Sequence, residues 1–195
     1  MMIRASRGLV LSAILLASSS VHAIPFTATL SGPGEIPANA SPGTGTGLVD
    51  FDPVAHTLSV NLTFSGLLST TTASHIHCCV APPTAAPVAT QVPTFIGFPL
   101  GVTAGSYSTV LNTLAAATWN PAFITSSGGT VAGAESVLAA GLAAGTAYLN
   151  IHTTQFPGGE IRGFLLPAGQ APEPAVWALL AVAGAGMIAA RRRRG

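Results

Sequence analysis

The sequence predicts an all-β domain, an antiparallel β-sandwich or Greek-key-like fold with one short helix. The clearest evidence is TLSVNLTFSG, in which apolar residues occupy every second position; they are Leu58, Val60, Leu62 and Phe64. Such alternation is typical of a strand with one buried and one solvated face. Further short strand-like segments are separated by turns rich in glycine and proline, and only one stretch has helical spacing.

The predicted strands follow one another along most of the chain. They are FTATLSG (26–32), GTGLVDFD (45–52), TLSVNLTFSG (57–66), TASHIHCC (72–79), SYSTVLN (106–112), AYLNIHT (147–153) and EIRGFLL (160–166). Asp50 and Asp52 share a strand face and prepare a turn at Pro53. GTGTG at 43–47 has the letters of a nucleotide fingerprint, but it leads into a strand and not a helix.

The remaining segments are predicted as loops and one helix. The proline-rich stretch 81–93 is expected to be loop, because proline cannot donate a full ladder of hydrogen bonds. TWNPAFITSSGG (118–129) is expected to be loop with a short helical turn. The single helix is predicted near Ala134 to Ala143, where Val137, Leu138 and Leu142 have helical spacing.

Residues 1–23 are predicted to be a secretory signal peptide. Arg4 and Arg7 precede an apolar run from Gly8 to Ala17, and a Val-x-Ala exit ends at Ala23. This order of a basic, an apolar and a small-residue segment is that of a cleaved export signal. The apolar run is too short for a transmembrane anchor. We therefore expect the export machinery to be a partner of this chain.

Residues 171–195 form a second distinctive end. Pro172, Glu173 and Pro174 precede an uncharged stretch over about 175–190, and a basic cluster ends the chain: Arg191, Arg192, Arg193 and Arg194. An apolar helix followed by arginines is expected to insert in a membrane with its basic end in the cytoplasm. This three-part order resembles the PEP-CTERM sorting signal, which implies recognition and processing by an exosortase-type membrane enzyme. The resemblance implies a transient inner-membrane anchor, and then a cell-surface or extracellular protein.

One domain, residues 24–170, remains between these ends. Its formal charge is −4, because it contains five acidic residues and a single basic one, Arg162, and the chain has no lysine. A nucleic-acid-binding surface needs clustered lysine and arginine, so the composition excludes that function. The abundance of threonine, serine, glycine and alanine suits an exported protein.

Three stretches of this domain resemble the CHRD domain in order: FTATLSGPGEIPANASPGTGTG, then LTFSGL with TTASHIHCC, then AYLNIHTTQFPGGEIRGFL. The His-x-His pair and the NIHT...FPGGEIRG ending are the most specific part. The resemblance implies an all-β domain of secreted proteins, without an established general enzymatic activity, and a role in binding or in the matrix. The chain departs from the family pattern at Cys78 and Cys79, where Gly-Pro is usual.

Three histidines are candidate metal ligands. His75 and His77 point to one face of their strand, and Asn150 and His152 share a face in the same way. If the two strands pair, three imidazoles converge, which suits zinc or copper. Glu160 and Arg162 share a strand face and are candidates for outer hydrogen bonds or charge. The alternative is that the histidines are hydrogen-bonded polar residues of a sheet.

Cys78 and Cys79 leave several states open. An exported protein favours a disulfide, which is either vicinal or intermolecular, and a thiolate ligand to the same metal is a further alternative. The sequence has no Gly-x-Ser-x-Gly, no His-Glu-x-x-His and no phosphate-binding loop. We therefore expect a non-enzymatic exported protein that acts through binding or structural contacts with an envelope or matrix partner. The alternative function is a copper- or zinc-binding, redox-capable secreted protein that uses His75, His77 and His152.

Overall fold

The computed structural model describes residues 23–169. The predicted signal peptide, apart from Ala23, and the predicted sorting tail with its apolar segment 175–190 lie outside these residues. Within residues 23–169, no helix is long and apolar enough to cross a membrane. The fold below is therefore that of the central domain.

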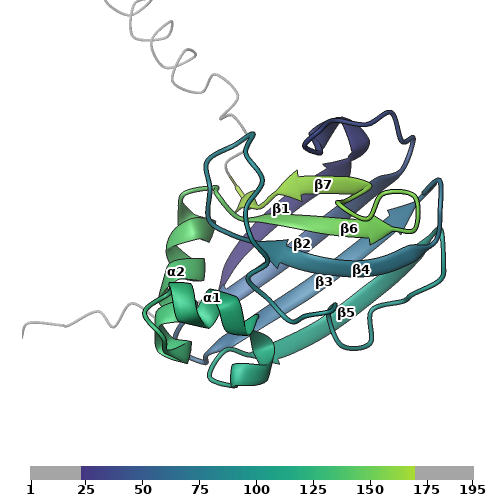
Figure 1. Cartoon of the computed structure of the whole chain (residues 1–195). Helices are drawn as coiled ribbons and strands as arrows, with labels where there is room; N and C mark the ends of the chain where they lie inside the picture. Colours follow the sequence, from purple (N-terminus) through teal and green to yellow (C-terminus); the bar gives the residue numbers. More distant parts are fainter. Residues whose placement is uncertain (1–22, 170–195) are drawn as a thin grey trace, which may run out of the picture.

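Eight strands form one antiparallel sheet (Figure 1). They are β1 (Ile24–Ser31), β2 (Thr44–Asp52), β3 (Thr57–Ser65), β4 (Thr71–His77), β5 (Gly105–Asn112), β6 (Tyr148–Thr153), β7 (Ile161–Phe164) and β8 (Leu166–Pro167). The order across the sheet is β4-β6-β7-β1-β2-β3-β5, and β8 pairs with β1. The predicted antiparallel all-β class is confirmed, and each strand predicted from the sequence has a counterpart.

The sheet curls so that one half faces the other. Figure 1 shows β4, β6 and β7 in front of β1, β2, β3 and β5. The hydrogen-bonded strands are continuous across both halves, although β7 pairs with β1 only through Arg162 and Ser31. The structure is thus a half-barrel, and the predicted sandwich of two separate sheets is corrected in this respect. A twisted sheet of this size closes its own apolar face by curling.

The GTGTG motif explains how closely the two halves approach. Its glycines, Gly43 just before β2 and Gly45 and Gly47 within it, are buried, whereas Thr44 and Thr46 are exposed. A side chain added at Gly47 would overlap with Leu149 of β6, and one added at Gly45 would lie 3.3 Å from Ile161 of β7. Glycine in a strand often marks such a close approach. The motif therefore serves packing between the front and back halves.

Helices close one side of the half-barrel (Figure 1). The six-residue α1 (Pro121–Ser126) and the longer α2 (Val131–Ala143) follow β5, with short 3-10 turns η1 (Gly32–Gly34) and η2 (Ala116–Thr118) elsewhere. Asn120 and Thr130 cap α1 and α2 by accepting backbone hydrogen bonds. Leu138 and Leu142 of α2 are fully buried in the core. The predicted helix is confirmed and begins three residues earlier.

The core lies between the two halves of the sheet and α2. It contains alternating residues of β1, β2 and β3, with Ile76 of β4, Leu149 and Ile151 of β6, and Ile161 of β7. All four named residues have no exposed surface. Because strand side chains alternate, the polar residues beside them on β4 and β6 must point away from this core. Those polar residues include the three histidines.

Candidate metal centre

Strands β4 and β6 bring the histidines together as neighbours in one sheet. Their antiparallel register places His75 opposite Asn150, Ile76 opposite Leu149, and Ala73 opposite His152. The even spacing of His75 and His77, and of Asn150 and His152, puts all four on the face opposite the core. The condition set by the sequence, that these two strands pair, is met.

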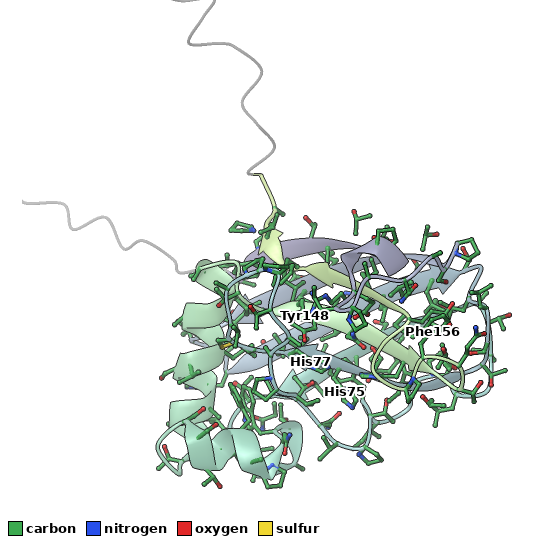
Figure 2. All side chains as sticks on the ribbon, turned by 45° about the horizontal axis from the view of Figure 1, so that its top comes forward. His75, His77, Tyr148 and Phe156 are labelled. Atoms are coloured by element: carbon green, nitrogen blue, oxygen red, sulfur yellow. A yellow bond between two sulfur atoms is a disulfide. The ribbon has the colours of Figure 1, made fainter. Side chains whose placement is uncertain are left out.

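The three imidazoles converge on one another, and Figure 2 shows two of them, His75 and His77, next to each other. One ring nitrogen from each of His75, His77 and His152 lies within 4.8 Å of the others. The ring centroids of His75 and His152 are 5.1 Å apart, and those of His77 and His152 are 5.8 Å apart. His75 and His77 are buried, and His152 is half-buried. The cluster therefore lies just beneath the surface, with its most open side at His152.

Each imidazole is anchored through its other nitrogen to a backbone carbonyl. His75 Nε2 lies 2.7 Å from the Pro93 oxygen, His77 Nδ1 lies 2.8 Å from the Ala86 oxygen, and His152 Nδ1 lies 2.8 Å from the Pro157 oxygen. A carbonyl oxygen only accepts, so each of these nitrogens donates a proton. In the neutral rings, the lone pairs are consequently on His75 Nδ1, His77 Nε2 and His152 Nε2.

These lone pairs face one another. His75 Nδ1 and His152 Nε2 are 3.2 Å apart, and the assigned tautomers leave no proton between them. His77 Nε2 is buried and has no hydrogen-bond partner within the described chain. Two nitrogens bound to one tetrahedral zinc at 2.0–2.1 Å are separated by about 3.3 Å. The distance between His75 and His152 already fits a shared cation.

Burial keeps the rings neutral. It lowers the pKa of His75 to about 4 and that of His77 to about 4, and it also lowers the pKa of His152. A metal binds only unprotonated imidazole, and the three rings are in that state at neutral pH. The second nitrogens that donate to carbonyls also match the arrangement around metal-bound histidines, where such bonds fix the tautomer and ring orientation.

Two loops supply the three carbonyls. Ala86 and Pro93 come from the proline-rich segment between β4 and β5, and Pro157 comes from the turn between β6 and β7, near Phe156 in Figure 2. The segment 81–93, expected to be loop, also forms an isolated antiparallel β-bridge between Val88 and His77. Its prolines lack N–H donors, but their carbonyls remain free to accept. The loop that interrupts the strand pattern thus orients the histidines.

Aromatic and charged neighbours flank His77. The Tyr148 ring stacks on it with a centroid distance of 4.8 Å and an interplanar angle of 10°. The Arg162 guanidinium carbon lies 4.7 Å from the Tyr148 ring centroid on a cation–π contact. Arg162 also donates to the Gly34 and Pro83 carbonyls at 2.5 and 2.6 Å. Sequence reasoning missed Tyr148, although its place two residues before Asn150 put it on the histidine face.

Glu160 and Arg162 have different roles, although both were candidates for the outer shell. Glu160 is fully buried and accepts hydrogen bonds from Ser41 Oγ, the Leu68 N–H and Thr153 Oγ1 at 2.6–2.7 Å. It therefore holds loops together, and its carboxylate partners within residues 23–169 are Ser41, Leu68 and Thr153 and not the histidines. Arg162 is the residue that reaches the vicinity of the cluster.

Cys78 and Cys79 are bonded to each other as a vicinal disulfide. They follow the end of β4 and pack against Gly141 of α2, where an added side chain would overlap with both sulfurs. Cys78 belongs to the apolar core. The group of potential ligands in residues 23–169 contains the three histidines and neither cysteine. Of the states left open by the sequence, the structure contains the vicinal disulfide, and the strand ends at His77 and not at Cys79.

His56 lies away from the cluster. It occupies the turn between β2 and β3 with a φ of 53°, a region that non-glycine residues rarely adopt. Its Nδ1 lies 3.0 Å from Glu135 Oε1 of α2, and Thr113 donates to the same oxygen at 2.5 Å. Asp52 Oδ1 accepts from the N–H groups of Val54 and Ala55 in this turn, as the predicted turn at Pro53 requires. His56 thus links the turn to α2.

The half-barrel and its covered histidine cluster define a small antiparallel β-domain with a candidate metal centre on one strand pair. The CHRD domain model matches residues 26–165, and the chain belongs to the CHRD domain family. No curated protein and no solved structure matches the chain. The resemblance inferred from the sequence is therefore confirmed for the central domain, and the tail resemblance remains a prediction.

Proposed function

We propose that this chain is an exported CHRD-domain protein that binds one transition-metal ion, copper or zinc, through His75, His77 and His152. The observation that carries the proposal is the direction of the lone pairs. Each ring donates one N–H to a backbone carbonyl and turns its other nitrogen toward its neighbours. Hydrogen-bonded polar residues of an ordinary sheet have no need for three acceptors to face one another.

The donor set favours copper and zinc over other common ions. Three neutral imidazoles suit zinc, copper and nickel, whereas magnesium and calcium take oxygen ligands. Among divalent ions, copper binds nitrogen sites more tightly than zinc. We therefore expect copper(II) to displace zinc when both are present. The three ligand nitrogens lie within 4.8 Å of one another, so closing the cluster around one tetrahedral ion with bonds of 2.0–2.1 Å requires the widest separation to shrink by up to about 1.5 Å.

Metal content tests the proposal directly. The chelator-treated protein is incubated with copper(II) or zinc, excess metal is removed by gel filtration, and bound metal is counted by mass spectrometry. One ion per chain is expected for the parent, and His152→Ala is expected to lose it. His152 is the best ligand to remove because it is half-buried, so its loss disturbs the core least.

A matched control uses the remaining histidine of the domain. His56→Ala also removes an imidazole, but His56 lies with Glu135 and Thr113 and not with the cluster. It is expected to retain one metal ion per chain. If the folded parent takes up neither copper nor zinc, the three histidines are polar residues of the sheet and the proposal is wrong.

A second candidate function is contact with the envelope or matrix, without catalysis, and one surface supports it. The outer face of β1, β2, β3 and β5 carries a row of hydroxyl residues in register: Thr29, Thr46, Thr63 and Ser106. The Thr46 and Thr63 hydroxyls lie 2.8 Å apart. This uncharged row suits repeated hydrogen bonding to a matrix partner. Thr46→Glu with Thr63→Glu is expected to release the protein from isolated matrix, whereas Ser136→Glu on the exposed side of α2 is not.

The proposal also includes export and sorting, which rest on the sequence alone. The predicted signal peptide 1–23 directs export, and the predicted tail with Pro172, Glu173, Pro174 and Arg191 to Arg194 directs exosortase-type processing. We propose an inner-membrane intermediate followed by release to the cell surface or beyond. Deletion of 171–195 is expected to abolish the membrane-bound intermediate seen by cell fractionation. A normal intermediate in the deletion variant would contradict the sorting role.

A further inference from the structure

Two buried side-chain atoms among residues 23–169 have no hydrogen-bond partner, and both lie on the histidine face. They are His77 Nε2 and Asn150 Oδ1. A buried polar atom without a partner destabilises the fold, so native folds rarely keep one without a use. His77 Nε2 is a ligand atom in the proposed function. Asn150 sits between Tyr148 and His152 on the same strand face, directly opposite His75.

The Asn150 amide has a defined orientation. Its Nδ2 donates to Glu35 Oε1 at 2.8 Å, and Asn150 is 2% exposed. The Glu35 oxygen accepts at this contact, so the nitrogen of the amide and not its oxygen lies on the Glu35 side. Glu35 lies on the β7 side of Asn150, because its carboxylate is 3.9 Å from Arg162, the β7 residue paired with Asn150. The other branch of the amide, Oδ1, therefore points away from Glu35 and is buried without a partner, in a residue that lies directly opposite His75 of β4.

The chain backbone holds the amide in this orientation. Gly159, in the turn after β6, approaches so closely that an added Cβ would lie 2.5 Å from Asn150 Nδ2 and 2.6 Å from Glu35 Oε1. Its φ of 133° is also one that favours glycine. The hydrogen bond between Asn150 and Glu35 is thus enclosed by backbone. The position of Oδ1 is set before any ligand arrives.

We propose that Asn150 is a positioning residue for the fourth ligand of the metal, and that this ligand is a water or hydroxide. The inference rests on the proposed function, since three protein ligands leave a tetrahedral ion one further position. Asn150 Oδ1 can only accept a hydrogen bond, so it stabilises a metal-bound ligand that carries a proton. It disfavours an anion without a proton, whose lone pairs would face the amide oxygen. Asn150 therefore selects which small molecules bind the metal.

Azide binding to the copper(II)-loaded protein tests this selection, because azide is an aprotic anion that replaces metal-bound water. The azide-to-copper charge-transfer absorption gives its dissociation constant. Asn150→Leu removes the acceptor and is expected to bind azide about fivefold more tightly, the effect of one net hydrogen bond near 1 kcal/mol. Asn150→Asp, made in the background of Glu35→Gln so that no second carboxyl shares its proton, keeps the size and adds negative charge, and it is expected to bind azide at least about tenfold more weakly than Glu35→Gln alone.

The two substitutions are expected to change the azide affinity in opposite directions. A general disturbance of the site would weaken azide binding in both variants. Asn61→Leu, on the outer face of β3, is the control and is expected to keep the parent's azide affinity. Copper content is measured on every sample.

If Asn150→Leu and Asn150→Asp hold one copper each but match their reference proteins, the parent and Glu35→Gln, in azide affinity, the inference is overturned while the proposed function stands. If Asn150→Leu does not fold, unchanged azide affinity in Asn150→Asp alone overturns it. A parent that binds no copper overturns the proposed function and the inference with it.

Discussion

His75 Nδ1 and His152 Nε2 lie 3.2 Å apart although 77 residues separate them in the chain. Both atoms carry lone pairs, because the partner nitrogens donate to the Pro93 and Pro157 carbonyls. Two facing lone pairs repel in the neutral state, and a bound cation removes that repulsion. A cation bound between these two nitrogens is therefore expected to stabilise the folded protein.

The metal-free protein is expected to lose stability as the pH falls from about 6.5 to about 4. Burial lowers the pKa of His75 and His77 from 6.5 to about 4. Within this window the unfolded chain binds protons that the folded chain does not, so acid favours unfolding. Each histidine contributes on the order of 3 kcal/mol at the acid end. Urea unfolding with chelator present, at pH 7 and pH 4.5, measures the difference.

The pKa of Glu35 shifts in the opposite direction, so Glu35 changes the stability with pH in the opposite sense to the histidines. It therefore supplies the control. Burial raises its pKa from 4.5 to about 7, so the folded state holds the extra proton. The stabilisation linked to Glu35 is complete below pH 4.5 and is lost as the pH rises through 7. Glu35→Gln removes this opposing effect and is expected to steepen the gain in stability between pH 4.5 and 7. A shallower pH dependence in Glu35→Gln would contradict both assignments.

Metal binding is expected to resist mild acid. Protons compete for an imidazole only near or below its pKa, and that pKa is about 4 for His75 and His77. A site of ordinary histidines, with pKa values near 6.5, weakens steeply below pH 6. The copper affinity, measured by competition with a chromogenic chelator, is expected to change by less than about tenfold between pH 7.5 and 5.5. A steep loss near pH 6.5 would show that the imidazoles titrate as exposed groups.

Gly47→Ala is expected to destabilise the fold by about 1–3 kcal/mol, the typical cost of overpacking. The added methyl group would overlap with Leu149 where β2 packs against β6. The penalty is expected to shrink in the background of Leu149→Ala, which makes room for it. Thr46→Ala, next to Gly47 on the exposed face, is the control and should change the free energy of unfolding little. An equal loss of unfolding free energy for Gly47→Ala with and without Leu149→Ala would mean that the methyl group does not clash with Leu149.

Much of this structure could be predicted from alternation, because period-two burial is a local property of a strand. The strand around Leu58 to Phe64 and the shared face of His75 and His77 follow from it directly. The pairing of β4 with β6 could not be predicted in the same way, since it joins residues more than 70 positions apart. The carbonyls of Ala86 and Pro93 were also inaccessible to sequence reasoning, because every residue type has a carbonyl. Asn150 was noted only as a neighbour of His152, and its bond to Glu35 depends on tertiary structure.

The vicinal disulfide makes α2 sensitive to a single methyl group. Gly141 of α2 lies against the sulfurs of Cys78 and Cys79, and Cys78 has no exposed surface. Alanine is normally a better helix former than glycine, by up to about 1 kcal/mol. Gly141→Ala is nevertheless expected to lower the free energy of unfolding by about 1–3 kcal/mol, because overpacking outweighs helix propensity at this contact.

Replacing both cysteines separates the two effects of that methyl group. In the background of Cys78→Ala with Cys79→Ala the sulfurs are gone, and Gly141→Ala is expected to become neutral or stabilising. Gly133 is a poor control, since a Cβ there would overlap with the Ser127 carbonyl, so Ser136→Ala on the exposed side of α2 serves instead. Chemical denaturation under oxidising conditions gives all the free energies. The same penalty with and without the cysteines would mean that the methyl group is resisted by the rest of the core. A penalty that disappears with the sulfurs would identify the disulfide as the group against which Gly141 of α2 packs.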